Sequence, residues 1–250
     1  MSQERIEDSI DTPWWGEHDQ RYVEALKHIG KNFTVLDIAC GNGFGTYKLF
    51  EQTQNTVIGG DVSDDALLYC KSKYQKYLKE DAFDFRKLDA TALDFNDNTF
   101  DAIVSFETIE HITDYNKVIT EFKRVLKPGG ILLLSTPNIA VSSPDGIIVN
   151  PYHVKEFTYD ELNSLLSSFS TCSIGGQQYV RYKNKNSGLA FLVERFLYLR
   201  GIRRLSTGIK NSIMRSLGIP NFYPVSNDYE IVWPFEEVMK CLTFFAICKK

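Results

Sequence analysis

The segment that most limits what this chain can fold into is residues 35–45, which read VLDIACGNGFG. An apolar strand that runs into a glycine-rich turn and then a helix is typical of the first strand of an open α/β sheet, where a nucleotide-like cofactor binds. Glycines at 41, 43 and 45 let the backbone turn tightly and come close to a ligand, because a side chain there would block the approach. We therefore expect a ligand that contacts the main chain of this turn.

Two residues separate this turn from a dinucleotide-binding loop. The G-x-G-x-x-G pattern would need glycine at position 46, where the chain has Thr46. Asp37 precedes the turn, and a carboxylate directed at the loop suits a cationic ligand better than an anionic pyrophosphate. The segment alone is also compatible with a tight strand-to-helix connection that binds nothing.

The D-x-A-C-G-x-G pattern from Asp37 to Gly43 resembles the first motif of the class I S-adenosylmethionine-dependent methyltransferases. Further segments agree in order and spacing over residues 33–168: VIGGD at 57–61 is expected as the second strand, and LDAT at 88–91 follows the third. FDAIVSF at 100–106 is expected as the fourth strand, and LKPGG at 126–130 as the turn before the fifth. Asp61 lies about twenty residues beyond the first glycine, where such folds place a ribose-binding carboxylate. In the family, an aspartate at the position of Asp89 reaches the adenine amino group.

The resemblance implies a Rossmann-like, seven-stranded, mostly parallel sheet with helices on both faces. It also implies S-adenosylmethionine as cofactor. The residues expected to bind it are Asp37, Ala39, Gly41, Gly43, Asp61, Val62, Asp89, Ala90 and Phe106.

Composition agrees with one globular α/β domain. The chain has 250 residues and a net charge of −4, so no global field attracts it to nucleic acid. Its five cysteines form no C-x-x-C pair, and the start of the chain is polar and acidic. We therefore expect no disulfide framework, no signal peptide and a reducing cytoplasm as the location.

Capping signals and apolar periodicity predict the helices and the late strands. Ser63 is expected to cap a helix running to Tyr77 or Lys79, and Thr113-Asp114 one that ends at Leu126. Thr158 and Glu161 resemble a capping box that opens a helix through Ser167. Late strands are expected at 172–180 and 242–248.

Three regions follow from this reading. Residues 1–32 form an N-terminal helical segment over the cofactor site, residues 33–180 and 236–250 form the methyltransferase core, and residues 181–235 form a basic helical lid before the last strand. Between Arg181 and Arg215 nine basic residues face one acid, Glu194, and residues 189–200 read as an apolar helix. The lid either packs on the core with solvated arginines, or meets an anionic substrate or a membrane surface, or contacts RNA.

The acceptor chemistry is suggested by Glu107, Glu110 and His111, an E-x-x-E-H cluster directly after the fourth strand. On a helical turn these three side chains would share one face. Methyl transfer needs little beyond positioning, but a hydroxyl acceptor must lose its proton, so a base or a metal should be near. Carboxylates and an imidazole suit Mg²⁺, Mn²⁺ or Zn²⁺.

His153 follows the fifth strand and completes a pattern that resembles ubiquinone-pathway O-methyltransferases and small-RNA 2′-O-methyltransferases. The resemblance implies a divalent ion at Glu107, Glu110, His111 and His153. The alternative is that Glu107 or His111 contacts the cofactor or caps a helix, while His153 acts alone as base; His111 and His153 are thus the candidate catalytic residues.

Other residues carry weaker signals. His18 and His28 are expected on an amphipathic N-terminal helix as ordinary surface residues, and Trp14 and Trp15 as core contacts or pocket walls. Tyrosines near the expected acceptor pocket are Tyr152, Tyr179 and Tyr182.

We interpret the chain as a methyltransferase acting on a hydroxyl of a small molecule, a sugar or a lipid-linked acceptor, with peripheral membrane contact through the lid and no nucleic-acid partner. The alternatives are an N-methyltransferase of a small molecule, an RNA 2′-O-methyltransferase and a non-catalytic binder of S-adenosylmethionine.

Overall fold

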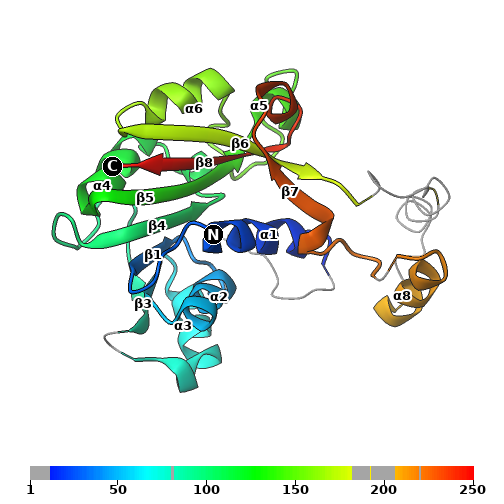
Figure 1. Cartoon of the computed structure of the whole chain (residues 1–250), viewed down its shortest axis with the longest axis horizontal. Coiled ribbons are helices and arrows are strands. Elements are labelled where there is room, and N and C mark those ends of the chain that lie inside the picture. The colour runs from blue at the N-terminus through cyan, green and yellow to red at the C-terminus, as the bar shows by residue number, and fades with distance from the viewer. Residues whose placement is uncertain (1–11, 80–81, 182–191, 193–205, 220) are drawn as a thin grey trace. The chain divides into compact units, whose positions relative to one another are not determined.

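A computed structural model describes residues 12–79, 82–181, 192, 206–219 and 221–250 (Figure 1). Its strands are β1 (Thr34–Ile38), β2 (Thr56–Asp61), β3 (Phe83–Lys87), β4 (Phe100–Phe106), β5 (Leu126–Pro137), β6 (Thr171–Tyr179), β7 (Tyr229–Val232) and β8 (Thr243–Lys249). Its α-helices are α1 (Trp15–Leu26), α2 (Phe44–Thr53), α3 (Asp64–Lys73), α4 (Tyr115–Val125), α5 (Ile139–Ser142), α6 (Tyr159–Leu166), α8 (Thr207–Ser216) and α9 (Phe235–Val238). Single 3-10 turns are η1 (Gln75–Tyr77), η2 (Ile109–His111) and η4 (Ser226–Asp228).

The described strands form one sheet in the order β3-β2-β1-β4-β5-β8-β6-β7. The first five strands of this order pair in parallel, and β8 runs antiparallel between β5 and β6. This confirms the α/β Rossmann-like fold, with eight strands in place of the expected seven. The extra strand is β7, because β6 offers a free edge and Gly175 lets another backbone come close: a Cβ there would lie 2.8 Å from the Val232 carbonyl oxygen.

Alternation along the strands sends side chains to two separate cores, as the twofold period of a strand requires. Leu36, Ile103 and Leu132 pack in one core with the helices α4 and α6. Val35, Ala102 and Leu133, each next to one of these residues in sequence, pack in the other core with α1, α2 and α3. Helices therefore cover both faces of the sheet, as predicted.

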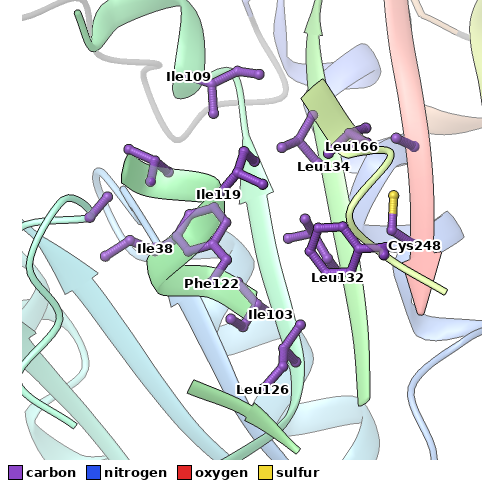
Figure 2. Packing of buried hydrophobic residues seen from close by; sticks show 14 of the residues in the cluster. Ile38, Ile103, Ile109, Ile119, Phe122, Leu126, Leu132, Leu134, Leu166 and Cys248 are labelled. Atoms are coloured by element: carbon purple, nitrogen blue, oxygen red, sulfur yellow. The ribbon is translucent and has the colours of Figure 1, made fainter. Parts of the chain in front are cut away.

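The core under α4 combines aliphatic side chains with the rings of Phe100, Phe122, Phe157, Phe169 and Phe244. Figure 2 shows Phe122 and Ile119 of α4 facing Ile38 of β1 and Ile103 of β4. Because Phe122 and Ile103 are fully buried, this packing holds α4 against the two central strands and fixes the turn between β4 and α4.

The predicted N-caps of α3 and α6 are in place, but α3 is shorter than predicted. The predicted capping box of Thr158 and Glu161 is confirmed, and Ser63 accepts a hydrogen bond from the Ala66 N–H. However, α3 ends at Lys73, short of the expected Tyr77, because Tyr74 leaves helical geometry and stacks on Phe85.

Two further local predictions need correction. Asp114 occupies the N-cap position of α4 but makes no side-chain cap bond. The segment LKPGG, expected as a turn, is the first part of β5, and the pairing register with β4 shifts between Phe100 and Ala102 to accommodate it.

The strand order places the β1 and β4 carboxyl ends next to each other. The chain adds β2 and β3 on one side of β1 and then returns to place β4 on the other side. In open α/β sheets, ligands bind in the crevice outside the strand ends at such a switch point. The glycine-rich turn after β1 and the acidic turn after β4 therefore belong to the same edge.

The chain divides into two compact units. Of the described residues, 21–178 and 231–250 belong to the first unit, which holds all the predicted cofactor, metal and catalytic residues and the sheet except for Tyr179, Tyr229 and Glu230. The second unit contains residues 12–20 and, with the gaps given above, 179–230. The predicted boundaries at 32, 180 and 235, and the covering and lid roles attached to them, stay predictions.

The second unit has a small core of its own, formed by Met214, Ile219 and Phe222. Two of the nine basic residues, Arg181 and Lys210, are buried in the second unit. The Arg181 guanidinium donates to the carbonyl oxygens of Phe222 and Asn221, and the Lys210 ammonium lies over the Phe222 ring at 5.2 Å. Arg215 is exposed, and the remaining six, with nearly all of the expected helix at 189–200, lie outside the described residues.

Cys172 and Cys248 stand directly opposite each other on β6 and β8 and form a disulfide. The sequence did not predict this pair, because the two cysteines lie 76 residues apart and only the strand register brings them together. Among the described residues, no helix has the length and apolar character needed to cross a membrane.

Candidate functional site

The glycine-rich turn after β1 combines several left-handed backbone conformations. Ala39, Gly41 and Gly43 have φ values of 62°, 56° and 75°. A Cβ at Gly41 would meet no atom within 4 Å, so the backbone there is open to a ligand, whereas a Cβ at Gly43 would lie 2.8 Å from the Phe85 ring. Gly41 fits the predicted role of close approach to a cofactor, and Gly43 also makes room for the core.

Gly45 has a different role from the one the sequence predicted. It is the second residue of α2, and a Cβ at this position would overlap the ring of Tyr22 from α1. Glycine is therefore required at position 45 by the packing of α1 against α2, and not by the backbone conformation of the turn. The sequence could not show this because Tyr22 lies 23 positions earlier.

Asp37 lies under the turn and is almost fully buried. Its carboxylate accepts hydrogen bonds from the Thr46 hydroxyl at 2.6 Å and the Tyr22 hydroxyl at 3.1 Å. Burial raises the pKa of Asp37 to about 7, against the lowering effect of these two hydrogen bonds. Thr46, which replaces the third glycine of a dinucleotide loop, is thus a partner of Asp37.

Asp61 connects the ends of β1 and β2. Its two carboxylate oxygens accept the Gly41 N–H at 3.0 Å and the Ser63 N–H at 2.9 Å. The next residue, Val62, is exposed. Asp61 is thereby oriented beside the open backbone of Gly41, which is the arrangement that its predicted role as a ribose ligand needs.

Asp89 and its neighbours follow β3. The exposed Asp89 carboxylate accepts the Thr91 N–H and hydroxyl, and these hydrogen bonds lower its pKa. Ala90 is buried in the core under α4. Phe106 packs edge-on against Tyr22, with ring centroids 5.0 Å apart.

The acidic turn after β4 separates its two glutamates. Glu107 has a left-handed φ of 49°, and the 3-10 turn η2 begins only at Ile109, so the three residues of the E-x-x-E-H cluster do not share one helical face. The Glu107 carboxylate accepts the Ser135 hydroxyl at 2.7 Å and lies 3.5 Å from the Arg21 guanidinium. It therefore faces β5 and α1, and the structure does not gather it with the other expected metal ligands.

Glu110, His111 and His153 do come together. One ligand atom from each lies within 4.8 Å of the others. Glu110 is fully buried; its Oε2 accepts the Thr136 hydroxyl at 2.9 Å, and its Oε1 has no hydrogen-bond partner. Burial, and next the nearby Glu107, hold the pKa of Glu110 well above its usual range.

The loop that carries His153 is fastened to this turn through the backbone. The N–H groups of Val154 and Lys155 both donate to the Glu110 carbonyl oxygen, at 2.8 and 3.2 Å. His111 Nδ1 lies 3.0 Å from the Tyr152 carbonyl oxygen, which can only accept, so Nδ1 carries the proton and the Nε2 lone pair is left for the site. The two imidazole rings meet edge-on at 4.8 Å.

Sequence reasoning missed three residues of this neighbourhood. Thr136 and Arg21 contact Glu110 and Glu107 from other elements and carry no local signal. Glu156 accepts a hydrogen bond from His153 Nδ1 at 2.8 Å. Its spacing of three residues from His153 was a usable signal.

The remaining candidates behave as ordinary residues. His18 lies beside Glu17 and His28 beside Glu24, and His28 stands beyond the end of α1. Trp14 is exposed, as are Tyr152 and Tyr179. Tyr182 lies outside the described residues.

Comparisons with known proteins agree on one family. Residues 29–186 match the family described as Methyltransferase domain. The chain is 32% identical over 62% of its length to a Mycolicibacterium smegmatis protein named a probable S-adenosylmethionine-dependent methyltransferase, of which it covers 58%. It is 32% identical over 54% of its length to a ubiquinone biosynthesis O-methyltransferase from Dinoroseobacter shibae, of which it again covers 58%. The chain thus spans less than two thirds of these relatives.

The solved structure of the YcgJ protein from Bacillus subtilis shares the fold, with a TM-score of 0.60, 20% identity, and coverage of 93% of this chain and 99% of that one. The open turn at Gly41, the oriented Asp61 and the match over residues 29–186 agree with one another. The chain therefore belongs to the class I S-adenosylmethionine-dependent methyltransferases.

Proposed function

We propose that this protein transfers a methyl group from S-adenosylmethionine to a hydroxyl of a small molecule, a sugar or a lipid-linked acceptor. The observation that carries the choice of oxygen is the group formed by Glu110, His111 and His153, in which the buried Glu110 Oε1 makes no hydrogen bond and lies 3.9 Å from His111 Nε2. A buried polar atom without a partner is costly, so this atom indicates a ligand that the site is built to take.

The described residues fit the cofactor. The Gly41 backbone has room for it, Asp61 is oriented for a ribose, and the exposed Asp89 is available to an amino group. When bound, S-adenosylmethionine supplies a methyl group on a positively charged sulfur. Asp37, at the base of the same turn, provides negative charge for a cationic ligand once it is ionised.

Glu110, His111 and His153 would hold a divalent cation. One carboxylate and two imidazoles suit Mn²⁺ or Zn²⁺ better than Mg²⁺, which prefers oxygen ligands. A cation there would lower the pKa of an acceptor hydroxyl. The residues themselves would position the acceptor beside the cation. Because both imidazole lone pairs would then be its ligands, the proton of the acceptor hydroxyl would leave to solvent. Glu107, bonded to Ser135, is left out of this proposal.

The test is a methyl-transfer assay that measures S-adenosylhomocysteine release against matched hydroxyl and amine acceptors, such as a catechol and its amino analogue. The protein is stripped with chelator and reloaded with Mn²⁺, Zn²⁺ or Mg²⁺. We expect turnover on hydroxyls only, lost on stripping and restored by Mn²⁺ or Zn²⁺. Full activity of stripped protein, or turnover on amines alone, would contradict the proposal.

Two histidine variants, one inside the cluster and one outside it, separate an effect on the metal site from an effect on the fold. His153→Ala should abolish metal-dependent turnover while leaving S-adenosylhomocysteine binding, measured by calorimetry, unchanged. The control His28→Ala removes a partly exposed imidazole from the region after α1 and should leave both measurements unchanged.

A further inference from the structure

The imidazole of His153 lies between two polar side chains of its own loop. Nδ1 is 2.8 Å from Glu156 Oε1, and Nε2 is 3.0 Å from Asn150 Nδ2. Each ring nitrogen of a neutral imidazole is either a donor or an acceptor, so these two neighbours decide which one carries the proton.

Both neighbours select the same tautomer. A carboxylate can only accept, so His153 Nδ1 must donate to Glu156. The orientation of the Asn150 amide follows from its other contact, because Asn150 Oδ1 accepts the Tyr152 N–H at 3.0 Å. The amide nitrogen therefore faces Nε2, which must accept. His153 is thus held with the proton on Nδ1 and the lone pair on Nε2.

Glu156 is itself rigidly placed. It is 2% exposed, and its second oxygen, Oε2, accepts the Ser143 hydroxyl at 3.0 Å. The Ser142 hydroxyl also contacts Oε2 and shares its one proton between that oxygen and the Asn138 carbonyl oxygen. A fixed carboxylate that orients a histidine is the arrangement found behind metal-binding and proton-accepting imidazoles.

We infer that Glu156 is a positioning residue that sets the tautomer of His153 and so keeps Nε2 as the lone-pair nitrogen of a ring that lies beside Glu110 and His111. This inference deepens the proposed function and rests on it for its chemical purpose. A cation or an acceptor hydroxyl would replace Asn150 as the partner of Nε2. His111 is held in the same tautomer by the Tyr152 carbonyl oxygen, so both rings offer Nε2.

The experiment reads the tautomer directly, by long-range ¹H–¹⁵N correlation in ¹⁵N-histidine-labelled full chain without metal, at a pH where the ring is neutral. We expect the Nδ1–H form of His153 in the wild type, although free imidazole side chains favour Nε2–H. In Glu156→Gln, the Ser143 hydroxyl keeps the amide oxygen at the Oε2 position, which turns the amide N–H₂ toward Nδ1. The tautomer should then invert to Nε2–H.

Glu161→Gln is the matched control, because Glu161 binds Thr158 and Lys155 and does not touch His153. It should leave the tautomer unchanged. An Nε2–H form in the wild type would overturn the inference even if the Glu156 variant failed to fold, and so would an unchanged tautomer in a folded Glu156→Gln protein.

A second measurement separates this inference from the proposed function. Mn²⁺ binding, followed by electron paramagnetic resonance, should weaken by about 10- to 100-fold in Glu156→Gln, as for other residues that orient a metal-binding histidine. Glu156→Asp, which keeps the carboxylate, should recover part of the loss. Failure of the wild type to bind Mn²⁺ or Zn²⁺ would overturn the metal site, while the metal-free tautomer still decides the role of Glu156.

Discussion

The buried carboxylate of Asp37, under the glycine-rich turn, makes the stability of the protein depend on pH. Its pKa is raised to about 7 because burial penalises the charged form more than the Thr46 and Tyr22 hydroxyls stabilise it. Between about pH 4 and 7 the folded state binds a proton that the unfolded state has released, so the contribution of Asp37 to stability falls as pH rises and is lost above about 7.

A cationic cofactor should favour the ionised form of Asp37 and reverse that penalty. We predict that S-adenosylmethionine binds about tenfold more tightly at pH 8 than at pH 6, as measured by isothermal titration calorimetry. Asp37→Asn should remove most of this dependence, since the side chain no longer ionises. An unchanged pH profile in that variant would assign the effect to another group.

Ala39 is strained in the same turn. Its φ of 62° is a conformation that costs most residues about 1–2 kcal/mol and glycine almost nothing. Because Ala39 is exposed and packs little, Ala39→Gly should stabilise the protein by about 0.5–1 kcal/mol after allowing for the greater entropy of glycine in the unfolded chain. Urea denaturation measures this directly; a loss of stability would mean that the methyl group contributes packing.

At the scale of elements, α1 is held to the sheet by polar contacts as well as apolar ones. Arg21 is almost fully buried and bonds Gln177 of β6 at 2.9 Å and Thr243 of β8 at 3.4 Å, in addition to its ion pair with Glu107. The neighbouring Tyr22 packs its ring against Gly45 and donates its hydroxyl to the Asp37 carboxylate. One turn of α1 thus contacts both the glycine-rich turn and the acidic turn.

The Tyr22 contact can be broken with a single methyl group. We predict that Gly45→Ala destabilises the protein by about 1–3 kcal/mol in chemical denaturation, as overpacking does, and weakens cofactor binding by displacing Tyr22 from Asp37. The control is Gly208→Ala in α8, where a Cβ meets only the Ser206 hydroxyl at 4.0 Å. That change should be neutral or stabilising, by up to about 1 kcal/mol, because alanine favours the helix.

The capping box of α6 is a second test at this scale. Thr158→Ala removes the hydroxyl that accepts the Glu161 N–H, and we expect it to cost about 1 kcal/mol of stability, measured by thermal or urea unfolding. Since α6 packs on the core under α4, unfolding should remain a single transition for the first unit. A change well below 0.5 kcal/mol would show that water replaces the cap.

At the scale of the whole molecule, nearly all of the sheet and every predicted cofactor, metal and catalytic residue lie in the first of two compact units. A ligand that binds only the folded form stabilises the part it binds by mass action. We therefore predict that saturating S-adenosylhomocysteine, at about 100 times its Kd, stabilises the first unit by about 2.7 kcal/mol. Hydrogen exchange should slow most in peptides covering residues 37–45, 61–63 and 89–91.

Exchange in α8 of the second unit is the internal comparison for this experiment. It should change little, because α8 contains none of the predicted cofactor contacts. Slowing confined to α8, with none in the three peptides of the first unit, would contradict the assigned cofactor site.

Patterns local in sequence determined the fold class, both core faces, the glycine-rich turn and the capping box of α6, because strand alternation, glycine spacing and caps act over a few residues. Distant contacts decided the rest. Only the tertiary structure placed Glu107 against Ser135 and Arg21 and left it outside the group of Glu110, His111 and His153. Only it paired Cys172 with Cys248 and added β7 to the sheet. A side chain's direction depends on the neighbours that satisfy its charge and hydrogen bonds, and folding takes those neighbours from anywhere in the chain.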